Sequence, residues 1–258
     1  MSDSLPVPPE ELRVWVGPFA DAEQFRESGE TLLRTLVDLC GLSAEEHVLE
    51  VGCGCGRLAI ALANRLGPAD RYEGFDVALP LLDWCRANLE PVLPNFRFRL
   101  VDTVAPAHNP GGAIAASDFR FPYESEAFDL AIAASVFTHM LPDGIENYVA
   151  EVARVLKPGG RCFATLFLFD ATAATAVAEG TTIFDFRYRV GPCLTFSAEH
   201  PEEGIACDEG WMLGLLEGSG LQVGQVRRGD WLAVRSYAIS QDTIVARKKP
   251  SHSTDPPN

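Results

Sequence analysis

The chain has 258 residues, of which 47% are hydrophobic and 22% charged, and its formal net charge at pH 7 is −15. This length and composition allow a sizeable core in a single α/β domain. The negative charge disfavours a nucleic-acid partner, because proteins that bind phosphates generally present a basic surface.

The sequence also argues against a membrane partner and against metal. No apolar run reaches the ~18 residues of a membrane helix, and the N-terminus lacks the basic-then-apolar order of a signal peptide. Seven cysteines, an odd number, fit a reducing compartment better than a disulfide framework. Cys53 and Cys55 are spaced like a metal pair, but no C-x-x-C or H-x-x-x-H partner accompanies them. We therefore expect a cytoplasmic protein with no metal site.

The two ends of the chain differ in composition from the rest. Residues 1–11 and 248–258 are rich in proline, serine and charged side chains, so we expect both to be disordered. The remainder is expected to form one domain. Between residues 21 and 40, apolar side chains recur every three or four positions, which predicts an amphipathic helix before the first strand.

Residues 48–57, V-L-E-V-G-C-G-C-G-R, predict a buried strand, a glycine-rich turn and a helix. Glycines at alternate positions remove the Cβ atoms that would keep a ligand from the backbone, and they permit positive φ angles. The spacing is E-x-G-x-G-x-G and not the G-x-G-x-x-G of a dinucleotide site, so we expect no NAD binding. The expected cofactor contacts at this turn are Glu50, Gly52, Cys53, Gly54, Gly56 and Arg57.

A second acidic residue follows at the spacing of one βαβ unit. Residues 71–77 predict a strand that ends at Asp76, 26 residues after Glu50, since 76 − 50 = 26. A carboxylate at this place can accept hydrogen bonds from both hydroxyls of a ribose. Asp76 and the adjacent Val77 therefore join the expected cofactor contacts.

Further strands and helices alternate along the middle of the chain. Residues 96–101, 128–135 and 161–169 predict strands, and a helix ends at Pro158-Gly159-Gly160. An unusually long connection with the turn-forming residues 109–112 separates the first two of these strands. This alternation predicts a mostly parallel sheet with helices on both faces.

The alternation stops after residue 169. Residues 171–207 include an Ala/Thr-rich helical segment and the aromatic residues Phe184, Phe186 and Tyr188. We expect this insertion to form a lid and a wall of the acceptor site, although the aromatics could equally be the core of a small subdomain. A helix over 208–218 and strands over 222–228 and 243–247 then predict a closing antiparallel hairpin.

Several of these segments resemble a known family. The glycine turn, S-V-F-T-H-M-L-P from Ser135 and R-V-L-K-P-G-G-R from Arg154 are similar to those of bacterial small-molecule S-adenosylmethionine (SAM) methyltransferases of class I, over residues 12–247. The resemblance implies a Rossmann-like, seven-stranded doubly wound sheet with a C-terminal antiparallel hairpin. It implies SAM as cofactor, with S-adenosylhomocysteine (SAH) as its product, and an N-terminal helix over the pocket.

The resemblance also implies several contacts to the cofactor and the acceptor. Asp118 and Phe119 stand about where the family contacts adenine, with Asp102 as the rival for the acidic residue. Ser135 and Val136 lie where the sulfonium is bound, and Phe137, with Trp15 or Phe19 from the N-terminal cover, is expected beside the acceptor. Base-modifying enzymes have an acidic residue or Asn followed by Pro-Pro-aromatic after the fourth strand, which is absent here.

Methyl transfer to a hydroxyl or an acidic carbon needs a base. His139 leaves the fourth strand at the sulfonium end, although it could instead brace a turn, and Glu199, His200 and His108 are weaker candidates. We expect a SAM-dependent methyltransferase that acts on a small organic acceptor, with natural-product biosynthesis as one setting. A methyltransferase-fold enzyme with non-methylating chemistry and a SAM-binding regulatory protein are the alternatives. The sequence leaves the methylated atom and the oligomeric state open.

Overall fold

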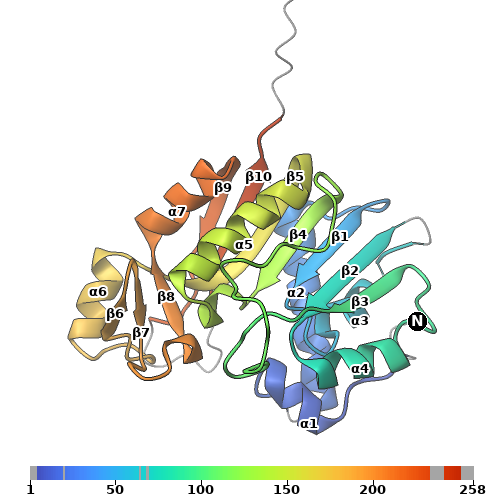
Figure 1. The fold of residues 1–258 in the computed structure, drawn as a ribbon, viewed down its shortest axis with the longest axis horizontal. Helices are drawn as coiled ribbons and strands as arrows, with labels where there is room; N and C mark the ends of the chain where they lie inside the picture. Colours follow the sequence, from blue (N-terminus) through green and yellow to red (C-terminus); the bar gives the residue numbers. More distant parts are fainter. Residues whose placement is uncertain (1–4, 20, 64, 68–69, 233–240, 251–258) are drawn as a thin grey trace, which may run out of the picture.

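The computed structural model describes residues 5–19, 21–63, 65–67, 70–232 and 241–250. Within these residues the strands form one ten-stranded mixed sheet, shown in Figure 1. The strands are β1 His47–Val51, β2 Arg71–Asp76, β3 Phe96–Leu100, β4 Phe128–Ala134, β5 Leu156–Phe169, β6 Tyr188–Val190, β7 Cys193–Thr195, β8 Ile205–Asp208, β9 Leu221–Arg227 and β10 Asp242–Lys248.

Seven of these strands form the doubly wound sheet expected from the sequence. The parallel strands β3, β2, β1, β4 and β5 are neighbours in that order, and β10 pairs antiparallel with both β5 and β9. The mixed α/β fold with its C-terminal antiparallel hairpin is thereby confirmed. Because β1 to β4 are parallel, their carboxyl ends meet along one edge, which is where open α/β sheets bind ligands.

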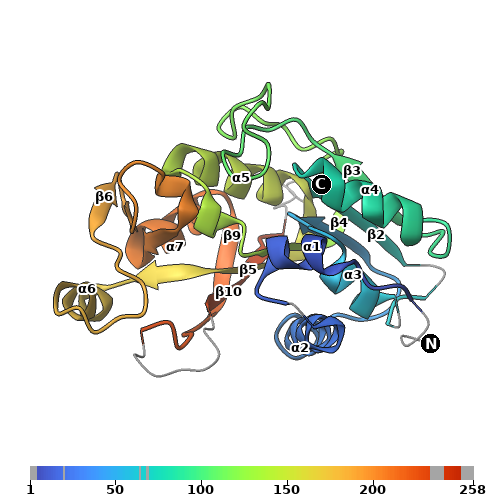
Figure 2. The same ribbon diagram turned by 90° about the horizontal axis from the view of Figure 1, so that it is seen from below.

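Helices cover both faces of the sheet, as Figure 2 shows with α2 and α5 on opposite sides. The helices are α1 Glu10–Arg13, η2 Val14–Val16, α2 Ala22–Cys40, α3 Arg57–Leu62, α4 Leu79–Asn88, η3 Phe137–His139, α5 Pro142–Val155, α6 Ala171–Ala178, η4 Pro201–Glu203 and α7 Glu209–Gly218. The predicted amphipathic helix is α2, which begins after Asp21, whose side chain accepts a hydrogen bond from the Glu23 N–H, and ends at Gly41 in the left-handed conformation.

Each face of the sheet has its own hydrophobic core. Side chains of α2, α3 and α4 pack on one face around Phe25, Leu58 and Tyr72. Side chains of α5 and α7 pack on the other face, together with Phe119 and Phe121 from the long connection after β3. The sheet is therefore buried on both sides, as expected of a parallel sheet.

The structure differs from the expectation at the N-terminus and in the insertion. Leu5 and Val7, expected to be disordered, pack against the core that contains α2. Residues 171–207 add β6, β7 and β8 to the end of β5 and have a small core of their own, so the sheet has ten strands and not seven. The expected disorder of residues 1–4 and 251–258 concerns residues outside the described part of the chain.

Candidate active site

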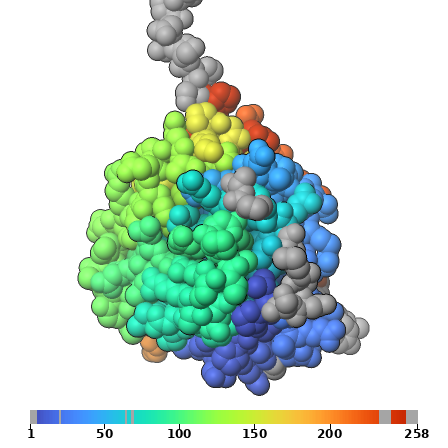
Figure 3. Space-filling model, turned by 90° about the vertical axis from the view of Figure 1, so that its right-hand side faces the viewer, coloured from blue at the N-terminus to red at the C-terminus, as the bar shows by residue number. Residues whose placement is uncertain are grey.

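A cavity of about 570 Å³ lies at the carboxyl ends of β1, β2 and β4. Its lining includes the glycine turn after β1, the ends of β2 and β4, the connection that follows β3, and the N-terminal residues Trp15, Val16 and Gly17. The segment from η3 into α5 also lines it, as do Glu202 of η4 and Gln241 just before β10. Figure 3 shows the N-terminal segment, in dark blue, beside the green surface around residue 100. The volume is within the range of small-molecule sites.

The glycine turn forms the floor of the cavity. Gly52, Gly54 and Gly56 all have positive φ angles, between +55° and +80°, which favour glycine. The N–H groups of Gly52 and Cys53 donate to the Phe75 carbonyl oxygen of β2, at 2.9 and 3.0 Å, and this holds the turn against the neighbouring strand. Gly52, Cys53 and Gly54 line the cavity.

Gly56 has a different position from the other two glycines. It is not among the described residues that line the cavity, and a Cβ there would lie 2.8 Å from a Leu89 side-chain atom and 3.2 Å from the Cys85 sulfur. Its bare Cα therefore allows α3 to begin close to α4. The structure assigns Gly56 to helix packing, which differs from the expected direct contact with a cofactor.

Asp76 lies beside the turn at the end of β2. One carboxylate oxygen accepts the Gly54 N–H at 2.8 Å, and the other accepts the Ala78 N–H at 2.9 Å. These bonds hold the carboxylate in one orientation at the cavity wall, where both oxygens keep a further lone pair for a ligand. Burial raises the pKa of Asp76, while the two N–H groups act in the opposite direction.

Glu50 and Arg57 are a carboxylic acid and a guanidinium that lie close together in the lining. Burial raises the pKa of Glu50 to about 8, against the opposing effect of a hydrogen bond donated by the Tyr72 hydroxyl. Arg57 begins α3 beside it, and its guanidinium carbon lies 5.4 Å from the centroid of the Phe19 ring. Burial lowers the pKa of Arg57 from its usual value. Phe19 itself packs with Phe25 and is not among the described lining residues.

The residues expected to contact adenine do not line the cavity, whereas their sequence neighbours do. Ser117 lines the cavity together with residues 103–106, whereas the side chain of Asp118 is exposed outside it. Phe119 is buried in the core, where its ring centroid lies 5.9 Å from that of Tyr148. The rival Asp102 is also exposed and outside the described lining, where Thr103 takes its place. Val77 does line the cavity.

The chain turns sharply where β4 ends. Ser135 has φ = +61°, which is uncommon for a residue with a side chain and stores strain. Its N–H donates to the Thr165 hydroxyl at 2.9 Å, and its hydroxyl donates to the Gln241 side-chain oxygen at 3.0 Å. Ser135 and Val136 both line the cavity, whereas Phe137, expected beside an acceptor, is buried in the core of the α5 face.

Two imidazoles face each other across one end of the cavity. His139 Nδ1 lies 3.0 Å from the Glu202 carbonyl oxygen, so Nδ1 carries the proton and Nε2 keeps its lone pair. The ring of His108, from the connection after β3, lies 6.5 Å from His139 and 5.7 Å from Trp15. Burial lowers the pKa of His139, and His108 lowers it further.

The aromatic insertion lies away from this cavity. Phe184 and Phe186 pack with Phe167, and Phe186 also packs with Trp231 at 5.7 Å between ring centroids. Tyr188 is 43% exposed on β6. The three aromatic residues do not line this cavity, which differs from the expected acceptor wall. Phe184 and Phe186 instead belong to a small core within the insertion, the alternative that the sequence left open, and Tyr188 lies on the surface of the insertion. Glu202 is the residue of 171–207 that lines the cavity.

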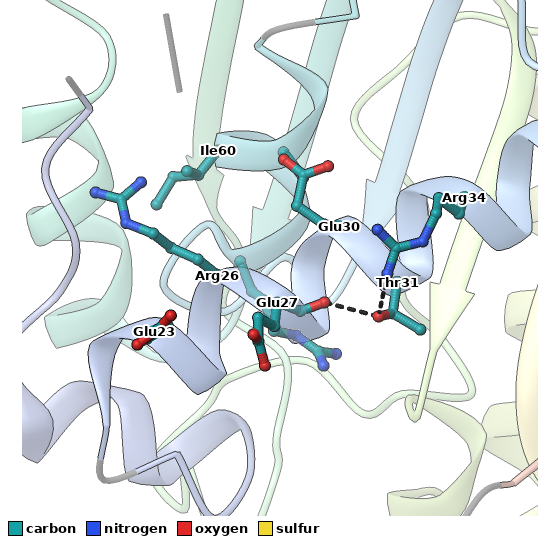
Figure 4. A pocket seen from close by; sticks show the side chains of 9 residues that line it. Glu23, Arg26, Glu27, Glu30, Thr31, Arg34 and Ile60 are labelled. Carbon is teal, nitrogen blue, oxygen red and sulfur yellow. Dashed lines mark hydrogen bonds between the residues drawn. The ribbon is translucent and has the colours of Figure 1, made fainter. Parts of the chain in front are cut away.

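A second hollow, of about 430 Å³, lies between α2 and α3 and is shown in Figure 4. Charged side chains of both signs from α2 surround it, and Thr31 donates to the Glu27 carbonyl oxygen while accepting from Arg34. Arg57 lines this hollow as well as the main cavity. The other polar side chains around this second hollow lie along the exposed face of α2, as expected for a solvated surface.

Comparison with known proteins gives similarities that agree with the fold and the glycine turn. Residues 48–160 match the family described as a methyltransferase domain. The fold resembles that of a Burkholderia thailandensis 1,6-didemethyltoxoflavin-N1-methyltransferase, solved with bound 1,6-didemethyltoxoflavin and SAH, with a TM-score of 0.53, 17% identity and coverage of 92% of this chain and 81% of that one. Residues 48–160 are thus similar to a methyltransferase domain, and the chain as a whole shares the fold of this methyltransferase.

Curated relatives span several substrates. The methyltransferase GfsG of Streptomyces halstedii is 30% identical over 64% of this chain and 54% of the relative. The nocamycin O-methyltransferase of Saccharothrix syringae is 33% identical over 50% of this chain and 40% of its own. The tRNA N(3)-cytidine methyltransferase METTL2 of Gallus gallus is 27% identical over 50% of this chain and 32% of the relative. The chain spans about half the length, or less, of these relatives.

Proposed function

We propose that this protein transfers a methyl group from SAM to a small organic acceptor. The observation that carries the proposal is the shared cavity: the glycine turn and Asp76 lie in the same hollow as His139. Gly52 and Gly54 have no Cβ atoms that would keep a ligand from the turn. Asp76 has a carboxylate beside the turn that could accept hydrogen bonds from the ribose hydroxyls of a cofactor. The donor set therefore fits an adenosine cofactor with a positive charge.

Each part of the cavity would have its own task. Glu50, Gly52, Cys53, Gly54 and Arg57 would surround the amino-acid end of the cofactor, Asp76 and Val77 the ribose, and Thr103 to Pro106 with Ser117 the adenine. When bound, SAM supplies an electrophilic methyl carbon. The protein's part is to hold a nucleophile in line with that carbon, to exclude water and, for a hydroxyl acceptor, to take the proton.

His139 is the residue that we propose as the base. Its Nε2 lone pair is available because Nδ1 donates to the Glu202 carbonyl, and that bond also orients the ring. The lowered pKa keeps the imidazole neutral at physiological pH, which is the form that accepts a proton. Once protonated, the ring still donates to Glu202.

We propose a small acceptor and not a nucleic acid. Support comes from the net charge of −15 and from the acidic lining residues Asp76, Asp143 and Glu202, which would repel phosphates. The relatives named for GfsG and nocamycin favour the same class, with natural-product biosynthesis as the setting. Seven free thiols, all buried, support a reducing, cytoplasmic location. No helix in the described part of the chain combines the length and apolar character needed to cross a membrane.

The test is transfer of labelled methyl from SAM in a metabolite extract of small molecules. We expect label on an organic-soluble product, with SAH formed in equal amount, and less label with the Asp76→Ala variant when the SAM concentration is limiting. An RNA pool in a parallel reaction should stay unlabelled. SAM binding by calorimetry without any transfer would favour a regulatory protein or non-methylating chemistry instead.

A further inference from the structure

Gln241, just before β10, has one end of its side chain held by the protein. Its Oε1 accepts the Thr165 hydroxyl at 2.7 Å and the Ser135 hydroxyl at 3.0 Å. Thr165 in turn accepts the Ser135 N–H, so its proton is directed at Gln241. This network joins the ends of β4 and β5 to β10 and defines which end of the amide is oxygen.

The other end of the same amide is left for a ligand. Gln241 lines the cavity, and no hydrogen bond from its NH₂ group to any described residue is present. An amide nitrogen cannot accept, so the group offers one or two N–H donors in a fixed direction. An amide donor oriented in advance binds an acceptor atom without the entropy cost of ordering a free side chain.

The charges around the cavity limit what that acceptor atom can be. Arg57 is the one Lys or Arg among the described lining residues, and it lies at the glycine turn, whereas Ser135, Val136 and His139 lie at the end of β4. Acidic Asp143 and Glu202 line the cavity near η3. A carboxylate would be repelled there, while a neutral carbonyl oxygen would be bound by the amide.

We propose that Gln241 is a specificity residue that binds a carbonyl oxygen of the acceptor, and that the acceptor is a neutral hydroxy-carbonyl compound whose hydroxyl faces His139. This proposal rests on the proposed function, because it concerns the acceptor of the same site. His139 belongs to η3 and Gln241 precedes β10, so the two groups select the spacing between the hydroxyl and the carbonyl oxygen.

The experiment compares three small probes that differ in one substituent. 2′-Hydroxyacetophenone, a phenol with an ortho acetyl group, has a carbonyl beside the hydroxyl, 2-ethylphenol lacks it, and salicylate replaces it with a carboxylate. Each is titrated by calorimetry into protein saturated with SAH. We expect the ketone to bind about tenfold more tightly than 2-ethylphenol, the effect of one added hydrogen bond. Salicylate should bind more weakly than the ketone.

Two variants assign that preference to Gln241. Gln241→Glu keeps an oxygen for the Ser135 and Thr165 hydroxyls but has no N–H donor, and Gln241→Met removes both functions. In each, ketone affinity should fall about tenfold to the level of 2-ethylphenol, while 2-ethylphenol and SAH affinities stay the same. Gln222→Met, at an exposed position of β9, should behave as the wild type.

The outcomes separate the two proposals. Equal binding of the ketone and 2-ethylphenol, no binding of any probe, tightest binding of salicylate, or a ketone preference that survives both variants would overturn the role of Gln241, with SAH binding left intact. If the wild-type protein fails to bind SAH, the proposed function itself is wrong. Thermal unfolding of both variants checks that their cavities remain folded.

Discussion

Asp76 connects two parts of the site through its two oxygens. Because the Gly54 and Ala78 N–H groups both donate to it, removal of the carboxylate would leave two backbone donors without their partner as well as removing a ligand contact. We expect Asp76→Ala to lower SAH affinity by about 1.5–3 kcal/mol, the usual scale for hydrogen bonds to a charged group. Calorimetry measures this, with Asp76→Asn as the matched control that keeps one acceptor oxygen. Wild-type affinity in Asp76→Ala would remove Asp76 from the site.

His139 can act as a base or can brace the turn at η3, and one variant distinguishes the two roles. As a base, His139→Ala should lower single-turnover methyl transfer about 10²–10⁴-fold and leave SAM affinity unchanged. As a brace, through its bond to Glu202, the same change should lower the melting temperature and SAM affinity with little effect on the chemical step. His200→Ala, in an exposed ring beyond the described lining, is the control.

The lowered pKa of His139 sets the direction of the pH dependence. The neutral ring is the active form, so the rate should be constant at neutral pH and fall as pH drops through a pKa below the usual 6.5. His108 lies beside His139 and also lowers the pKa of His139. A pH profile of the single-turnover rate for wild type and His108→Gln checks this. An acid limb that persists in His139→Ala would assign the titration to another group.

The glycine turn and the N-terminal segment meet at one glycine. A Cβ on Gly54 would lie 2.5 Å from the Val16 side chain, and φ is +55°, so Gly54→Ala adds a clash to backbone strain. We expect lower stability and weaker SAH binding. Gly159 also has a positive φ, +79°, but nothing lies within 4 Å of its Cβ position, so Gly159→Ala should cost about 1–2 kcal/mol of stability and leave binding unchanged. Urea unfolding and calorimetry compare the pair, and unchanged SAH binding by Gly54→Ala would contradict the expected contact.

Local segments were the part of the fold that the sequence predicted well. The strand, turn and helix around Gly52 follow from residues that are neighbours in the chain, and Asp76 follows from the length of one βαβ unit. The connection after β3 has no such period, so the register that places Ser117 and not Asp118 on the cavity could not be read from it. The alternation of aromatic and polar residues over 184–188 predicts one buried face, but it could not show whether the rings pack inside the insertion or against the cavity.

Gln241 shows the limit for residues that depend on distant contacts. Nothing near it in sequence indicates a site, and its position arises because β10 lies between β5 and β9. Ser135 is 106 residues away and Thr165 is 76. The sequence named His108 only as a weaker candidate base, and its contact with Trp15 also joins segments far apart in the chain. Pairing between strands far apart in the chain, which sequence patterns describe poorly, brings these groups together.

At the scale of the whole molecule, Glu50 links folding to pH. Its pKa is raised to about 8 in the folded protein, whereas an unfolded Glu titrates near 4.5, so the folded state binds the extra proton between these values. Its contribution to stability is present below pH 4.5 and is lost as pH rises through 8. We therefore expect urea unfolding to show wild type losing stability relative to Glu50→Gln between pH 5 and 9. Parallel curves for the two proteins would show that Glu50 titrates normally.

The acidic lining has a consequence for turnover. SAM carries a positive sulfonium, and SAH is a neutral thioether at the same atom, so methyl transfer removes one unit of positive charge from the occupant. Asp76, Asp143 and Glu202 all line the cavity and attract the cation more than the neutral product. We therefore expect this protein to bind SAH less tightly than SAM, which would limit inhibition by the product. Because salt screens this attraction, the affinity ratio of SAM to SAH should fall as ionic strength rises.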